Sequence, residues 1–184
     1  GCAITNATVN VTVNPQPNAG TDGNTTVCDN SVAAIDLFSL ITGEQAGGTW
    51  TQTSGTGGTF NAATGTYTPA AGATTSMFTY TLVGTAPCVN DTSIATININ
   101  PQPTAGNDGS TTTCESSVTT IDLFSLITGE QAGGTWTQTS GTGGTFNAAA
   151  GTYTPAMGAT TSTFTYTLVG TAPCINDTSI ATVN

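Results

Sequence analysis

The cysteines are the residues of this chain with the clearest chemistry. Four of the five form two sets with one spacing, Cys28 with Cys88 and Cys114 with Cys174, each 60 residues apart. A repeated spacing in a chain that contains no histidine indicates disulfide bonds rather than catalysis. Cys2 precedes both sets.

Two disulfide pairings fit these positions. The favoured pairing joins Cys28 to Cys88 and Cys114 to Cys174. The alternative joins Cys2 to Cys28 and Cys88 to Cys114, with the partners 26 positions apart in each case. Either bond would contribute about 2–4 kcal/mol, which is a large share of the stability of a small domain.

The composition excludes several other functions. A zinc site built from these thiolates is not expected, because the chain has neither a C-x-x-C spacing nor a histidine. A nucleophilic cysteine would lack a base. The chain has no Lys or Arg, ten acidic residues and a net charge of −10, so it lacks the cations that bind nucleic acid or an anionic membrane surface. No apolar run approaches the roughly 18 residues of a membrane span. We therefore expect no enzyme activity, no nucleic-acid partner and no membrane insertion.

The acidic residues suggest a calcium site. Asp22 and Asn24 lie together in Asp22-Gly23-Asn24, and Asp108 begins the corresponding Asp108-Gly109-Ser110. Calcium binds about six to eight carboxylate, amide or carbonyl oxygens. The alternative is an ordinary Asp-Gly turn, because the dense D-x-D-x-D pattern of strong sites is absent. No other cofactor is expected.

The chain repeats itself with a period of 86 residues. Aligning residues 15–98 with 101–184 gives 84 pairs, of which 71 are identical. The expected domains are the end of a preceding repeat at 1–14, one repeat at 15–100 and a nearly complete repeat at 101–184, as in a window from a longer array. A long fixed period is typical of arrayed modules, in which neighbouring identical repeats are the first partners.

Each repeat predicts about seven short strands separated by turns, the pattern of a β-sandwich. Alternation is clearest in Ser76–Val83, where Phe78, Tyr80 and Leu82 face one side. A helical turn is expected within Asp36–Ile41. The other expected strands are Thr25–Cys28, Ala33–Leu37, Thr49–Thr53, Thr59–Phe60, Thr66–Thr68 and Thr92–Asn100. The expected core is Ile35, Leu37, Phe38, Leu40, Trp50, Phe60, Tyr67, Phe78, Tyr80 and Leu82, with their counterparts 86 residues later.

The motifs of the repeat resemble a known family. These motifs are Cys28, Ile35-Asp36-Leu37-Phe38-Ser39-Leu40, Gly47-Gly48-Thr49-Trp50, Gly65-Thr66-Tyr67-Thr68-Pro69, Phe78-Thr79-Tyr80 and Cys88-Val89-Asn90-Asp91. They resemble the Ig/PKD-like repeats of giant surface adhesins of Bacteroidetes-type bacteria, including gliding-motility adhesins exported by type IX secretion. The resemblance covers both repeats. It implies an all-β fold of tandem immunoglobulin-like sandwiches that form an extended array on the bacterial cell surface.

The resemblance also implies glycosylation. Bacteria of that group modify Thr or Ser directly after Asp, which makes Thr92 and Thr178 acceptors. The alternative is a turn leading into the last strand. Asn90-Asp91-Thr92 is also an N-x-T sequon.

Two functions follow from these observations. The first is a non-enzymatic stalk or filament segment of a secreted adhesin, with homotypic contacts between neighbouring repeats. The second is a multivalent module that binds a glycan or a surface and gains avidity from repetition. The second function requires exposed aromatic residues on loops, for which Tyr67 and Tyr153 are the candidates.

Overall fold

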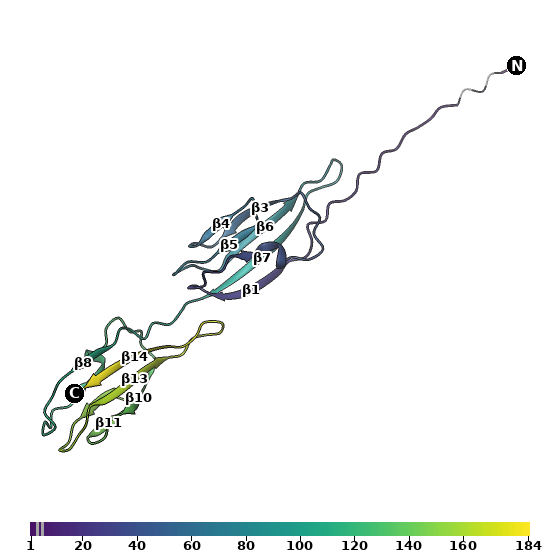
Figure 1. Ribbon diagram of the computed structural model, residues 1–184. Coiled ribbons are helices and arrows are strands. Elements are labelled where there is room, and N and C mark those ends of the chain that lie inside the picture. The colour runs from purple at the N-terminus through teal and green to yellow at the C-terminus, as the bar shows by residue number, and fades with distance from the viewer. Residues whose placement is uncertain (3, 5) are drawn as a thin grey trace. The chain divides into compact units, whose positions relative to one another are not determined.

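The computed structural model describes residues 1–184 except 3 and 5, which lie within the expected segment 1–14. The chain is all-β and divides into two compact units (Figure 1). Unit 1 contains Gly1–Thr26 and Ser31–Ile99, and unit 2 contains Val27–Asn30 and Asn100–Asn184. The described residues form no helix with the length and apolar character that crossing a bilayer requires.

Unit 1 is built on two sheets. The larger has the order β1-β7-β6-β3, and the smaller has the order β2-β5-β4. The described residues before β1 form no named strand, and Val9, Val11 and Val13 are exposed. The strands are β1 (Gly23–Cys28), β2 (Ile35–Asp36), β3 (Thr49–Ser54), β4 (Thr59–Asn61), β5 (Thr66–Thr68), β6 (Ser76–Leu82) and β7 (Asp91–Asn100).

Unit 2 repeats this topology, with sheets in the orders β10-β13-β14-β8 and β11-β12-β9. Strand β13 is antiparallel to both β10 and β14, whereas β8 pairs with β14 in parallel. Seven strands therefore form per repeat, as the sequence predicts. They are β8 (Gly109–Thr111), β9 (Ile121–Asp122), β10 (Thr135–Ser140), β11 (Thr145–Asn147), β12 (Thr152–Thr154), β13 (Ser162–Leu168) and β14 (Asp177–Val183).

Aromatic rings join the two sheets of each unit. The alternation of β6 buries Phe78 and Tyr80 completely or nearly so. The ring of Phe78 lies 4.9 Å from the rings of both Phe60 and Tyr67 on the smaller sheet. Phe164 makes the same contacts in unit 2. Offset and edge contacts of this kind add to the burial of apolar area, so each unit is a sandwich around one aromatic core.

The predicted helical turn is a short 3-10 helix, η1 (Leu37–Ser39), with a counterpart, η2 (Leu123–Ser125). The Asp36 carboxylate accepts a hydrogen bond from Phe38 N at 3.0 Å and caps this turn. Leu37 is buried as predicted, but Phe38 is 37% exposed and was wrongly predicted to lie in the core. The Phe38 ring makes T-shaped contacts with the rings of Trp50 and Tyr80, at centroid distances of 5.4 and 5.3 Å.

Candidate functional site: the disulfide and the docked segment of unit 2

Among the residues that the structure describes, one disulfide forms, between Cys28 and Cys174, with their Cα atoms 5.0 Å apart. This distance is in the usual range for a disulfide. The two cysteines are 146 residues apart in sequence. Both belong to unit 2, although Cys28 comes from the first sequence repeat, and both are buried, at 7% and 6% exposure. We call Val27–Asn30 the docked segment.

The docked segment is held by hydrogen bonds as well as by the disulfide. Asp29 N donates to Asn100 O at 2.9 Å. The Asp29 carboxylate accepts from Gln102 N at 2.9 Å, and Asp29 is only 9% exposed. A hydrogen bond to a charged group is among the stronger ones. The chain thus enters unit 2 along the end of β1 and is fixed there by its backbone, a carboxylate and a sulfur atom.

The other half of this site is a loop that two amide side chains hold in place. Asn100 Nδ2 donates to Ala172 O at 2.8 Å, and Gln102 Nε2 donates to Ile175 O at 3.0 Å. The peptide bond between Ala172 and Pro173 is cis. We call Asn100, Gln102, Ala172, Cys174 and Ile175 the acceptor site, because it receives the docked segment.

Neither disulfide pairing expected from the sequence forms within the described part of the chain. Cys88 and Cys114 are free thiols, one half-buried and the other exposed, and Cys2 is also free and exposed. The parallel pairing of the first and last strands explains why a bond within one repeat fails. In unit 2, the end of β8 lies beside the end of β14, whereas Cys174 precedes the start of β14. Seven residues of strand span roughly 23 Å, far beyond the reach of a disulfide from Cys114.

The carboxylates of the expected calcium site bind backbone groups instead. Asp22 Oδ1 accepts from Ile94 N at 2.8 Å and from Ser93 Oγ at 3.4 Å. Asp108 makes the same bonds to Ile180 N and Ser179 Oγ, at 2.7 and 3.4 Å. Among the described residues, no three His, Cys, Asp or Glu side chains gather in a group that could hold a metal. Calcium binding here stays a prediction.

Close backbone packing explains the glycine in Asp22-Gly23-Asn24. A Cβ on Gly23 would collide with the backbone carbonyl of Leu40. A side chain at this position would therefore push β1 away from the segment that follows η1. Asn24 and Asp22 line a shallow hollow with Thr96 and Asn98 of β7. Asp22-Gly23-Asn24 is therefore the start of β1, fixed to its neighbours, and the Asp-Gly turn given as the alternative is not formed among these residues.

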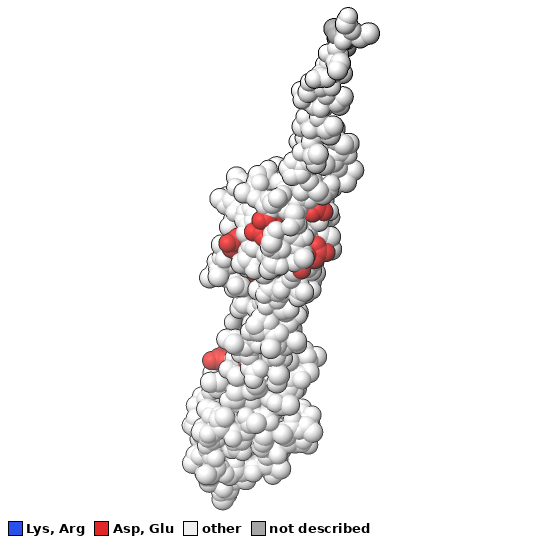
Figure 2. All heavy atoms as spheres, turned by 90° about the vertical axis from the view of Figure 1, so that its right-hand side faces the viewer, with Lys and Arg blue, Asp and Glu red and all other residues white. Residues whose placement is uncertain are grey.

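Other carboxylates also accept backbone hydrogen bonds. Asp91 Oδ2 accepts from Ala19 N at 2.7 Å, and Asp177 Oδ2 accepts from Ala105 N at 2.8 Å. The chain has no cationic side chain, so these N–H groups supply the positive partners that Lys or Arg would otherwise provide. Figure 2 shows the acidic side chains as separate spots on a face that is otherwise uncharged.

The two aromatic candidates for ligand binding are buried. Tyr67 and Tyr153 are each 1% exposed, and their hydroxyls donate to Gly57 O and Gly143 O at 2.7 and 2.6 Å. The expectation that they lie exposed on loops was wrong, and their assignment to the core is confirmed. The predicted glycan acceptors, Thr92 and Thr178, are exposed second residues of β7 and β14. Their modification stays a prediction.

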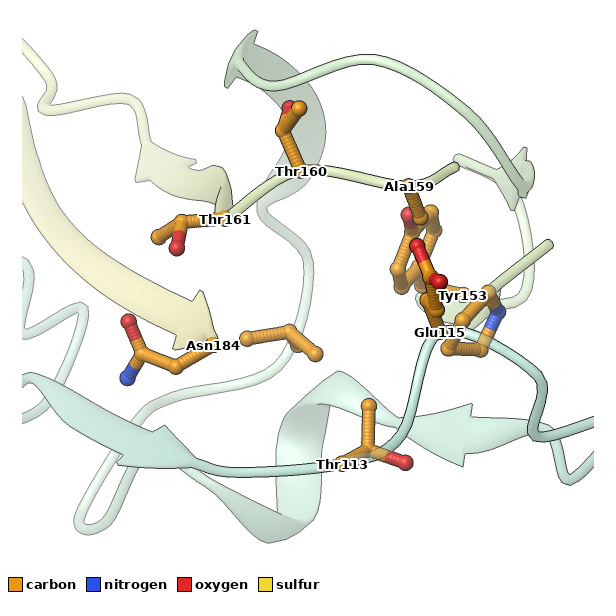
Figure 3. A pocket seen from close by; sticks show the side chains of 9 residues that line it. Thr113, Glu115, Tyr153, Ala159, Thr160, Thr161 and Asn184 are labelled. Carbon is orange, nitrogen blue, oxygen red and sulfur yellow. The ribbon is translucent and has the colours of Figure 1, made fainter. Parts of the chain in front are cut away.

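A cleft of about 200 Å³ lies beside Tyr153 in unit 2 (Figure 3). Glu115 Oε2 accepts from Gly158 N at 3.0 Å at its mouth. In unit 1 the strand β7 continues past the corresponding position, and Ile99 N donates to Thr75 Oγ1 at 3.3 Å. The cleft in unit 2 is lined by Thr113, Glu115, Tyr153, Pro155, Ala159, Thr160, Thr161, Val183 and Asn184.

Comparisons with known proteins add little. No family model and no curated protein match the chain. A Drosophila N-cadherin fragment, EC1-4, is 7% identical, with a TM-score of 0.42 over 89% of this chain and 48% of that one. Two structures of an endo-fucoidan hydrolase from glycoside hydrolase family 107 are 16% and 15% identical, with TM-scores of 0.21 and 0.22, over 92% of this chain and 28% of theirs. The chain thus spans under half the length of each of these proteins. Similarities at this level carry no argument about function.

Proposed function

We propose that this chain is a non-enzymatic stalk segment of a secreted bacterial cell-surface adhesin. Its tandem sandwiches act as spacers that withstand tension. The disulfide between Cys28 and Cys174 carries this proposal, because it covalently ties a segment of the first repeat into the unit formed by the second. Such a tie limits the extension of a chain that is pulled along its length, which is the demand on a stalk.

The covalent topology predicts how the chain responds to force. The disulfide bypasses 146 of the 184 residues. A force applied to the two termini acts on β1 and β14, which lie outside the disulfide loop, but it reaches strands β2 to β13 only after the disulfide breaks. Strands β2 to β13 are shielded in the oxidised protein and become extensible in the reduced protein.

The family resemblance supports the cellular setting of the proposal. The repeats resemble those of Bacteroidetes-type adhesins, so we place the whole protein outside the cell, with export by type IX secretion and a role in adhesion or gliding. A disulfide is the kind of bond that persists in that oxidising setting. Glycans on Thr92 and Thr178 and calcium at Asp22 and Asp108 belong to the same proposal.

The alternative, a multivalent glycan- or surface-binding module, has no observation in its favour. Its two candidate residues, Tyr67 and Tyr153, are buried in the sandwich cores. A module of that kind would need a different set of exposed side chains.

Single-molecule pulling from the two termini tests the stalk proposal. Outside the disulfide loop about 38 residues remain, which corresponds to an extension of roughly 130 Å at ~3.5 Å per residue. With a reductant the whole chain should extend to roughly 650 Å. Equal extensions in the two conditions would contradict the shielding on which the proposal rests.

A further inference from the structure

Unit 1 carries the same acceptor site as unit 2. Asn14 Nδ2 donates to Ala86 O at 2.8 Å, which is the distance between Asn100 Nδ2 and Ala172 O. Gln16 Nε2 donates to Val89 O at 3.4 Å. The Cys88 thiol lies 3.4 Å from Asn14 O, as Cys174 Sγ lies 3.3 Å from Asn100 O. The site is thus preformed around a free thiol.

Unit 2 carries a second copy of the docked segment, at residues 113–116. Its cysteine and its acid, Cys114 and Glu115, are exposed, whereas Cys28 and Asp29 are buried in the acceptor site of unit 2. One chain therefore displays both halves of a joint that it also contains in the assembled form. The exposed halves are the segment 113–116 and the acceptor site around Cys88.

The second copy keeps the groups that the joint uses. Residues 113–116 read Thr-Cys-Glu-Ser where the docked segment reads Val-Cys-Asp-Asn. Docking in unit 2 uses a cysteine sulfur, a backbone N–H and a carboxylate, and Cys114 and Glu115 supply all three. On the acceptor side, Asn14, Gln16, Ala86 and Cys88 are identical to their counterparts, and only Val89 differs, from Ile175.

We propose that the segment 113–116 of one molecule docks at the Cys88 acceptor site of a second molecule, and that a disulfide between Cys114 and Cys88 then joins them. This contact is heterologous, because each molecule contributes a different surface, so it continues from copy to copy instead of closing a symmetric dimer. The inference concerns assembly between molecules and does not depend on the stalk function.

The covalent step needs a disulfide oxidant, such as oxidised glutathione. The Cys114 thiolate attacks one glutathione sulfur, forms a mixed disulfide and releases one glutathione thiolate. The Cys88 thiolate then attacks the Cys114 sulfur and releases the second glutathione. Two protein thiols are oxidised to one disulfide, one oxidised glutathione is reduced to two thiols, and the two protons of the protein thiols end on the glutathione thiols.

The joint would create a short covalent path through each molecule. Tension that enters at Cys88 leaves at Cys114, only 26 residues further along the chain. Most of both sandwiches lies outside this path. The bond already present has the same arrangement: Cys28, at the end of the first strand of one repeat, pairs with Cys174, which precedes the last strand of the next.

Oxidative assembly of the chain with Cys2→Ser tests the proposal, because this change removes the remaining exposed thiol. In a glutathione redox buffer, a non-reducing gel should show a ladder at multiples of 18.2 kDa that a reductant collapses. Cys114→Ser alone and Cys88→Ser alone should each stay monomeric. Mixing these two variants should give a heterodimer and nothing larger, since only one complementary pair of thiols remains.

Docking and random collision of thiols give different results. Gln16→Ala and Asn14→Ala keep both thiols but disturb the acceptor site, and each should slow oligomer formation roughly fivefold. Asn24→Ala, an exposed change outside the site, is the matched control and should not slow it. Homodimers of Cys114→Ser, unchanged rates for both acceptor variants, or a monomer with an internal bond between Cys88 and Cys114 would each overturn the proposal.

Discussion

The two repeats have nearly the same sequence and core but different cysteine chemistry. In unit 2 the cysteine before the last strand, Cys174, is buried in a disulfide, whereas its counterpart Cys88 in unit 1 is a free, half-buried thiol. The acceptor sites themselves match in sequence and hydrogen bonding. The difference is the docked segment, which the first repeat supplies to unit 2. The acceptor site of unit 2 is therefore filled by a segment of the neighbouring repeat.

The largest expected effects test whether the two cores are equivalent. Phe78→Ala in unit 1 and Phe164→Ala in unit 2 should each cost about 3–5 kcal/mol in the free energy of unfolding, because both rings are fully buried. Hydrogen exchange measured by mass spectrometry reports each unit separately. A cost confined to the mutated unit, and similar for the two variants, is expected. Strongly unequal costs would mean that the cores differ as well as the cysteines.

Removing the disulfide should affect one unit only. Cys174→Ser should lower the stability of unit 2 by about 2–4 kcal/mol and leave unit 1 unchanged, because the bond and its docked segment belong to unit 2. Cys88→Ser is the matched control, since Cys88 occupies the same position in unit 1 without a bond, and it should cost little. Denaturation followed by hydrogen exchange checks both. An equal loss from the two variants would break the comparison between the units.

The carboxylate of the docked segment should matter more than that of its counterpart. Asp29→Ala removes the acceptor of the Gln102 N–H in a buried setting and should cost about 1–3 kcal/mol in unit 2. Glu115→Ala, at the exposed equivalent position, should cost less than about 1 kcal/mol. Chemical denaturation of the two variants under oxidising conditions gives both values. Similar costs for the two variants would show that docking does not determine how much this acidic residue contributes to stability.

The smallest effect concerns a contact that both units share. Tyr80→Phe and Tyr166→Phe each remove a hydroxyl that donates to the Gln45 or Gln131 carbonyl at 2.8 Å. Both should cost about 1 kcal/mol, equally in the two units. Thermal denaturation of each variant is sufficient. A loss of stability from Tyr166→Phe alone would mean that the docked segment also affects the part of unit 2 around Tyr166.

The strands were predictable because they depend on local patterns. Alternation in β6 placed Phe78 and Tyr80 inside, and Asp36 before an apolar run placed the helical turn. The disulfide was not predictable from spacing, because it depends on the parallel neighbour of β14 and on a segment that leaves its own repeat. The signal that could have indicated this was the direction of the first strand relative to the last. Tyr67 fitted both a core and a loop, and only the packing against Phe78 separates the two.

The central claim is the bond between Cys28 and Cys174, and a peptide map tests it directly. After the free thiols are blocked, a protease that cleaves after glutamate cuts at Glu44, Glu115 and Glu130. The account predicts that fragment 1–44 remains linked to fragment 131–184 until a reductant is added. A link between fragments 1–44 and 45–115, as a bond between Cys28 and Cys88 requires, would contradict it. Bonds within fragment 1–44 and within fragment 45–115, as the pairing of Cys2 with Cys28 and of Cys88 with Cys114 requires, would contradict it as well.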